Sequence, residues 1–301
     1  NKTIDLRVSA YPTIYGENVV MRLLDKSSIM LGLTDLGFSK DSLAVFDKMI
    51  KRPYGIILVT GPTGSGKTTT LYAALQSINS LEKNIITIED PVEYHLPLIR
   101  QSQVNPKAGL TFASGLRAIV RQDPNIIMVG EIRDLETVEI AIHSALTGQL
   151  VFSTLHTNDA PSAITRLIDM GAQPFLIASS LVGIAAQRLV RVLCENCKQP
   201  YKASPELLRQ LGLREDEDVT FYKPIGCRRC NDIGYMGRWG IFEIMTCDDQ
   251  TRRLTVAKVA AIDIKRHAQE IGMKTLREDG LEKVKAGITS LEEVLRVTQE
   301  E

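Results

Sequence analysis

Short apolar runs alternate with helical patterns through the first two thirds of the chain. Four such runs are rich in β-branched residues and are bounded by polar or glycine-containing segments, at residues 56–59, 85–88, 126–129 and 150–155. Buried parallel strands have this near-continuous apolar character, and helices connect one strand to the next. The pattern therefore predicts an α/β fold with a parallel sheet covered on both faces.

The first 25 residues follow a different pattern. Residues 4–8 alternate apolar and polar, residues 18–24 can alternate likewise, and Pro12 and Gly16 interrupt the stretch between them. Period-two alternation on both sides of turn-forming residues predicts a β-hairpin.

Helical spacing and capping residues predict helices on both sides of the α/β region. Ser39 can cap a helix that Pro53 stops, and residues 273–285 have the pattern of another. The last helix is expected to begin at Thr289, with Glu292 reaching back in a capping box.

A glycine-rich motif follows the first apolar run. The stretch GPTGSGKT matches G-x-x-x-x-G-K-[ST] and stands between a predicted strand and a helix beginning near Lys67. Glycines let backbone N–H groups surround phosphate oxygens at a helix N-terminus, and Lys67 and Thr68 are expected to hold phosphates and Mg²⁺. A chance glycine turn would not have both flanking elements. The predicted nucleotide contacts are Gly61, Pro62, Thr63, Gly64, Ser65, Gly66, Lys67, Thr68 and Thr69.

Acidic residues follow two further runs. Glu131 comes after the run at 126–129, where a Walker B strand would normally end in Asp, and Glu89 and Asp90 follow the run at 85–88. Carboxyl ends of parallel strands meet at the ligand crevice, so Glu131 is a candidate general base, water-positioning group or outer Mg²⁺ partner. A solvated strand end is the alternative for each acid alone.

Three basic residues are weaker candidates from spacing alone. His156 follows the run at 150–155, and Arg117 and Arg121 lie four apart in a predicted helix, on one face. A purely structural role explains His156 equally well. A solvated basic face explains Arg117 and Arg121 better than a functional role does.

Two cysteine pairs predict a metal site. Cys194-x-x-Cys197 and Cys227-x-x-Cys230 are separated by 29 residues. Two such pairs can close a tetrahedral tetrathiolate site, which suits structural Zn²⁺. Disulfides and free structural cysteines are the alternatives, and unpaired Cys247 is expected to be a buried small apolar residue.

Composition narrows the function classes. The 301 residues suggest about two domains, and 36 basic residues balance 36 acidic ones, so no basic field favours nucleic acid. The longest apolar stretch, residues 175–186, is too short for a membrane helix. Five cysteines do not make a disulfide scaffold, and the opening at Asn1 in a strand-like pattern suggests a natural start upstream.

Taken together, these blocks resemble the ATPases of type II secretion and type IV pilus assembly, the GspE/PilB group. The similarity covers nearly the whole chain and is carried by GPTGSGKTTT, ITIEDPVEY, LRAIVRQDPNIIMVGEIRD, STLHTN and MKTLREDGLEKVKAGITSLEEVL. The opening IDLRVSAYPTIYGENVVMRLLD resembles the end of the family's PAS-like N-terminal subdomain, most of which is then absent here.

The resemblance implies a RecA-like P-loop core and four regions. These are a PAS-like remnant and linker (1–30), the core (31–190), a tetracysteine zinc subdomain (191–245) and a helical C-terminal region (246–301). It also implies ATP, Mg²⁺ and Zn²⁺, a homo-hexamer, and a cytoplasmic location peripheral to the inner membrane, next to assembly-platform proteins. No nucleic-acid partner is expected.

The resemblance also assigns site residues. Glu131 becomes the leading catalytic acid, with Glu89 and Asp90 in support, and His156 stays in place. Gln149 stands where the family's usual histidine is expected and cannot titrate near neutral pH. Arginines would complete the site: Arg7 and Arg22 near the γ-phosphate, and Arg117, Arg121, Arg133 and Arg238 in phosphate or subunit contacts.

The function expected from the sequence is a motor for pseudopilus or pilus assembly. A pilus-retraction ATPase is the alternative within the family, which the tetracysteine element disfavours. A RecA-like DNA translocase and a non-catalytic nucleotide-binding scaffold are the alternatives outside it. The residues do not decide between type II secretion and pilus assembly.

Overall fold

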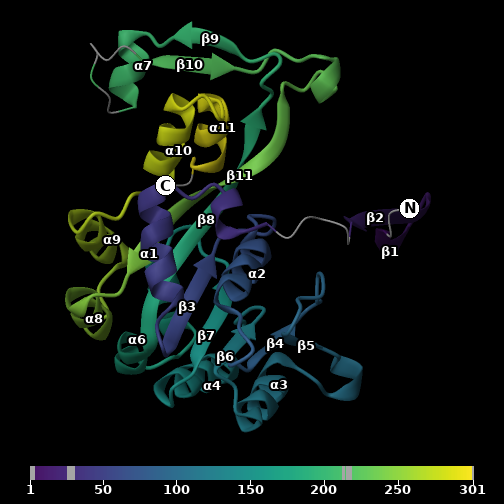
Figure 1. Cartoon of the computed structure of the whole chain (residues 1–301), viewed down its shortest axis with the longest axis vertical. Coiled ribbons are helices and arrows are strands. Elements are labelled where there is room, and N and C mark those ends of the chain that lie inside the picture. Colours follow the sequence, from purple (N-terminus) through teal and green to yellow (C-terminus); the bar gives the residue numbers. More distant parts are fainter. Residues whose placement is uncertain (1–3, 26–30, 212–213, 215–218, 300–301) are drawn as a thin grey trace.

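A seven-stranded sheet forms the centre of the molecule (Figure 1). The structure is a computed structural model that describes residues 4–25, 31–211, 214 and 219–299. Six strands run parallel, and the edge strand β11 runs antiparallel to β8. In spatial order the strands are β11 (Tyr235–Thr246), β8 (Leu181–Leu193), β3 (Gly55–Thr60), β7 (Leu150–Leu155), β6 (Ile126–Val129), β4 (Ile85–Glu89) and β5 (Arg100–Gln103). The four apolar runs are the buried strands β3, β4, β6 and β7, which confirms the predicted α/β class.

Helices cover both faces of this sheet because successive strand residues point to opposite sides. Ile57 and Val59 of β3 enter one core with α1 (Lys40–Ile50) and α2 (Lys67–Ile78). Ile56 and Leu58 enter the other, which includes α3 (Phe112–Ile119), α4 (Leu135–Leu146), α5 (Pro161–Asp169) and α6 (Pro174–Ser180). The carboxyl ends of β3, β4, β6 and β7 therefore meet at one edge of a sheet that helices cover on both faces.

The predicted hairpin is present as β1 (Ile4–Thr13) and β2 (Gly16–Asp25). Its strands are longer than the alternation suggested. Pro12 lies inside β1 opposite Glu17 and not in the link. Proline has no N–H to donate, and β1 tolerates it because this strand pairs on one side only, with β2.

The C-terminal region is helical, as predicted, with α8 (Asp249–Val256), α9 (Ala261–Glu270), α10 (Leu276–Lys285) and α11 (Leu291–Val297). Ser39 caps α1 as expected, but the predicted cap of the last helix is wrong by one residue. Ser290 caps α11, while the Thr289 hydroxyl donates to the Arg191 carbonyl at 2.8 Å. Glu293 therefore stands at the third helical position, where Glu292 was predicted, and its carboxylate makes no capping bond because it accepts hydrogen bonds from Arg191 and Arg296.

The strands β8 and β11 were not expected from the apolar pattern. The predicted boundary between residues 190 and 191 lies inside β8, and β11 returns from the cysteine-bearing segment to pair with it. The apolar stretch 175–186 divides between α6 and β8. The excursion itself contains β9 (Gln199–Lys202), α7 (Pro205–Gln210) and β10 (Thr220–Lys223), at the top of Figure 1.

Among the described residues, none of the helices is both long enough and apolar enough to cross a membrane.

Candidate nucleotide site

The loop from β3 to α2 has the backbone that a phosphate-binding loop needs. Gly61, Gly64 and Gly66 have φ values of 145°, 81° and 88°, which side chains rarely allow. A Cβ atom at Gly61 would come within 2.3 Å of the Gln187 carbonyl oxygen. The Ser65 hydroxyl is buried and has no hydrogen-bond partner in the described part of the chain. The loop therefore offers polar groups for an incoming anion.

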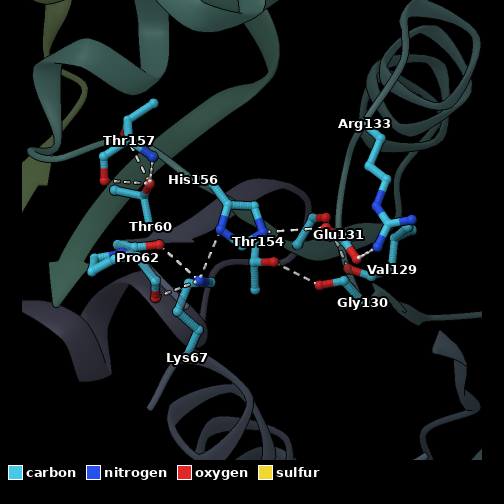
Figure 2. Close-up of polar contacts among 12 residues, drawn as sticks. Thr60, Pro62, Lys67, Val129, Gly130, Glu131, Arg133, Thr154, His156 and Thr157 are labelled. Atoms are coloured by element: carbon cyan, nitrogen blue, oxygen red, sulfur yellow. Dashed lines mark hydrogen bonds and ion pairs between the residues drawn. The ribbon is translucent and has the colours of Figure 1, made fainter. Parts of the chain in front are cut away.

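Lys67 begins α2 and folds back over this loop. Its Nζ donates to the carbonyls of Gly61 at 2.7 Å and Pro62 at 3.1 Å, and lies 3.5 Å from His156 Nδ1 (Figure 2). Burial lowers the pKa of Lys67 to about 8, and nearby Glu131 limits the decrease while Arg188 adds to it. Phosphate oxygens are stronger partners for this cation than neutral carbonyls.

Glu131 faces the same point from the end of β6. Its Oε2 lies 3.2 Å from His156 Nε2, and Arg133 Nη2 donates to Oε1 at 2.5 Å (Figure 2). Burial alone would raise the pKa of Glu131, but the bonds from Arg133 and His156 lower it overall. The carboxylate is therefore ionised at neutral pH, as a proton acceptor must be.

Hydroxyl groups fix the two loops that carry Glu131 and His156. Thr154 Oγ1 donates to the Gly130 carbonyl at 2.7 Å, next to Glu131. The backbone N–H of Thr157 donates to Thr60 Oγ1 at 2.9 Å, which ties the end of β7 to the end of β3. The carboxylate and the imidazole thus project from strand ends that bond directly to each other.

Glu89 lies deeper than the sequence suggested. Its side chain is buried and accepts hydrogen bonds from Tyr72, from Thr87 at 2.5 Å and from Gln101 at 3.1 Å. Burial is the largest cause that raises the pKa of Tyr72, and its bond to Glu89 adds to the effect. The network links α2 to β4 and β5, while Asp90 next to it is exposed.

These groups line one cleft with a volume of about 620 Å³. Leu23 of β2 and Arg238 of β11 also line it, so the N-terminal hairpin and the edge strand of the sheet both contribute to its wall. The predicted site residues on its wall are Thr63, Gly64, Ser65, Gly66, Lys67, Thr68, Thr69, Glu89, Asp90, Glu131, His156 and Arg238.

Other predicted arginines lie outside this cleft. Arg117 is exposed and pairs with Glu136 of α4. Arg121 does not continue the same helix, because α3 ends at Ile119 and the chain tightens into the 3-10 turn η3 (Val120–Gln122). Its Nε instead donates to the Arg117 carbonyl at 3.3 Å.

Arg7 and Arg22 are opposite each other in the hairpin, but their side chains lie outside the described residues. Gln149 precedes β7, at the far end of that strand from His156. Its carbonyl accepts from Gly55 N at 3.1 Å and its side chain from Thr147 at 2.9 Å. The substitution of glutamine for histidine there does not touch the cleft.

Two residues of β8 beside the P-loop were missed. Buried Gln187 accepts a bond from Thr70 of α2 at 2.7 Å, and Arg188 donates to Asn158 at 3.0 Å. Arg188 and Arg296 line a groove of about 340 Å³ next to the cleft. No local motif marks these residues, because they approach the loop only when β8 pairs with β3.

The four paired cysteines converge as predicted. The sulfur atoms lie within 4.8 Å of one another, with Cys194 and Cys227 3.9 Å apart and Cys197 and Cys230 3.8 Å apart. Thiolates at ~2.3 Å from a tetrahedral zinc would be separated by about 3.8 Å. A hydrogen bond from Asn196 is the main cause that lowers the pKa of Cys227 to about 6. The donor set fits a closed zinc site, and none of the four is in a disulfide.

The sequence matches known proteins over nearly its whole length. Residues 1–296 match the family described as type II/IV secretion system protein. Type II secretion system ATPase E of Vibrio cholerae is 54% identical over 299 residues, covering 99% of this chain and 59% of the relative. The type IV pilus assembly ATPase PilB of Thermus thermophilus is 56% identical over 299 residues, covering 99% of this chain and 34% of the relative. The chain thus spans about three fifths of the first relative and a third of the second.

Solved structures show the same fold. The pilus retraction motor PilT with bound ADP matches at a TM-score of 0.69 and 28% identity, covering 97% of this chain and 77% of that one. The ATPase DotB of Legionella pneumophila matches at 0.70 and 20% identity, covering 100% and 74%, which supports the fold alone.

Proposed function

The chain belongs to the type II/IV secretion system protein family, and from this premise we propose that it binds and hydrolyses ATP. The observation that carries the proposal is the line of contacts from Lys67 through His156 to Glu131 across one cleft. A binding scaffold has no need of an ionised carboxylate facing the P-loop lysine, whereas phosphoryl transfer to water does.

In this mechanism, Lys67 exchanges the Gly61 and Pro62 carbonyls for β- and γ-phosphate oxygens. Thr68 would hold Mg²⁺, which would supply neutralisation of the phosphate charge. Glu131 accepts the proton of the attacking water, and Arg133 and His156 keep it ionised and oriented. Glu89 positions α2 through Tyr72, Asp90 contacts the nucleotide from the rim, and Arg238 binds phosphate from β11.

We further propose that hydrolysis drives assembly of a pseudopilus or pilus, as the names of the two relatives suggest. The working unit would be a homo-hexamer, cytoplasmic and peripheral to the inner membrane, which acts on membrane-bound assembly-platform proteins. Arg7, Arg22, Arg117 and Arg121 would then act at subdomain or subunit contacts. The tetracysteine segment, with Zn²⁺ bound, favours a pilus-assembly ATPase over a pilus-retraction ATPase.

The test is the ATPase rate per chain as a function of protein concentration, with Glu131→Gln as the blank. A rate that rises with concentration is expected if neighbouring chains complete the site. A rate of zero in well-folded protein with bound nucleotide would support a scaffold, and stimulation by DNA would support a translocase.

A further inference from the structure

A second cavity lies at the opposite edge of the sheet from the P-loop. Its volume is about 820 Å³. The first residues of β3 and β8 line it together with residues of α6 and α8, two helices that pack against each other at the lower left of Figure 1. Small-molecule sites have volumes of ~300–1,000 Å³, so this cavity is large enough for a ligand.

Much of its wall is apolar and uncovered. Tyr54 and Phe175 line the mouth with 58% and 56% of their surface exposed, and Val256 of α8 is 51% exposed. Leu181 and Val182 lie deeper, at the start of β8. An apolar hollow of this kind favours an aliphatic or aromatic group.

The same cavity is rimmed by positive charge. Arg52, Arg252 and Arg253 line it, and none of its lining residues is acidic. Arg252 pairs with Asp249 at 2.9 Å, whereas Arg52 and Arg253 make no ion pair or side-chain hydrogen bond within the described ranges. The chain as a whole has a formal charge of zero, so the three guanidinium groups are a local concentration. Guanidinium groups match carboxylate and phosphate geometry.

We propose that this cavity binds a small amphiphilic anion, with one phosphate or carboxylate group on an apolar body. The anionic group pairs with Arg52 and Arg253, and the body packs on Tyr54, Phe175 and Leu181. Because β3 runs from this cavity to the P-loop, the ligand does not compete with a nucleotide for the cleft.

The test is calorimetric titration with decyl phosphate below its micelle concentration, in the presence of Mg·ADP. One site per chain is expected. Arg253→Glu should weaken binding at least ~10-fold, and Ser179→Trp, on the exposed wall, should block it. Arg266→Glu makes the same charge change on α9, outside the cavity, and should leave affinity unchanged. No binding, equal weakening by Arg266→Glu, or equal affinity for neutral decyl maltoside would overturn the proposal.

A second experiment distinguishes two possible sources of the amphiphilic anion, a lipid bilayer and a soluble molecule. If the headgroup belongs to a bilayer, vesicles of phosphatidylglycerol should sediment the protein but not its Arg253→Glu variant. If decyl phosphate binds and the vesicles do not, the ligand is a soluble amphiphile. Equal unfolding midpoints for the variants and the unaltered chain exclude misfolding as the cause of any loss.

Discussion

At the scale of single residues, the main chemical assignment is Glu131. Glu131→Gln keeps the shape of the side chain but removes the proton acceptor, so nucleotide binding should persist while hydrolysis falls about 10²–10⁴-fold. Steady-state ATPase rates and ADP affinity measure the two effects separately. Glu139→Gln, an exposed change on α4, is the matched control. Normal hydrolysis by Glu131→Gln would show that another group activates water.

Lys67 gives the nucleotide affinity a pH dependence. Its pKa of about 8 means that the side chain is a cation below pH 8 and loses its proton above it. Bound phosphate favours the cation and raises this pKa, so the dissociation constant for ADP should be flat below pH 8 and increase by up to ~10-fold per pH unit above it.

Fluorescence titration with a labelled ADP from pH 6.5 to 9.5 measures this curve. Lys67→Ala should bind more weakly throughout and lose the increase above pH 8. An identical increase in Lys67→Ala would assign the titration to another group.

The sequence predicted the site residues that directly follow a strand. It missed the residues that approach the site only through pairing of strands distant in the sequence. The P-loop, Glu131 and His156 each follow a strand directly, so the strand pattern places them at one edge. Gln187 and Arg188 reach the loop only because β8 pairs with β3, across more than a hundred residues of chain. The burial of Glu89 likewise depends on Tyr72 and Gln101 from other elements.

At the scale of elements, Glu293 fastens α11 to β8. Its buried carboxylate accepts hydrogen bonds from Arg191 at 2.7 Å and from Arg296 at 2.7 Å. Burial opposes ionisation, but these bonds lower the pKa of Glu293 to about 2. Glu293→Gln should reduce the free energy of unfolding by about 1.5–3 kcal/mol at pH 7.

The pH dependence follows from the depressed pKa of Glu293. The contribution is fully present above the unfolded value of ~4.3 and is lost as pH falls toward 2, so the two proteins should converge in acid. Urea denaturation at several pH values measures the difference, and Glu292→Gln, exposed on the same helix, is the control. A constant difference down to pH 3 would contradict the assignment. Any metal release in acid affects both proteins alike.

The tetracysteine cluster joins the end of β8 to the start of β11. Cys194→Ser should lower bound zinc from about one per chain to near zero and expose the excursion at β9 and β10 to protease. Metal analysis and limited proteolysis measure these outcomes. Cys247→Ser is the matched control, because Cys247 lies outside the cluster. Unchanged zinc content in Cys194→Ser would exclude this cysteine as a ligand.

The pattern of apolar runs predicted strands only where both faces are buried. β3, β4, β6 and β7 are fully buried and read as continuous apolar segments. β8 and β11 extend beyond β3 as a two-stranded ribbon at one end. Charged residues of this ribbon, such as Arg191 and Arg238, interrupt the apolar pattern of the two strands. The Thr289 cap was misplaced for a related reason, since Thr289 and Ser290 are equivalent locally and only contact with β8 distinguishes them.

At the scale of the whole molecule, the structure divides the four candidate arginines whose side chains it describes into two groups. Arg238 lines the cleft of its own chain, and Arg133 bonds to Glu131, which lines the same cleft. Arg117 and Arg121 lie outside the cleft, and Arg117 pairs with Glu136 on the surface. For a ring assembly we therefore propose that Arg238 acts within its own chain, and that Arg117 exchanges Glu136 for a phosphate group bound to a neighbouring chain.

Mixing two inactive variants tests this division. When Lys67→Ala chains are mixed with Arg117→Ala chains, some subunit contacts bring an intact P-loop of one chain next to an intact Arg117 of the next chain. In a randomly mixed ring about a quarter of contacts are of this kind, so up to that share of the activity should return. A mixture of Lys67→Ala chains and Arg238→Ala chains should recover no ATPase activity, because every cleft then lacks either Lys67 or Arg238. Recovery with Arg238→Ala would place that arginine in a neighbour's cleft. If the Arg117 mixture stays inactive while assembled rings are seen, Arg117 works within its own chain.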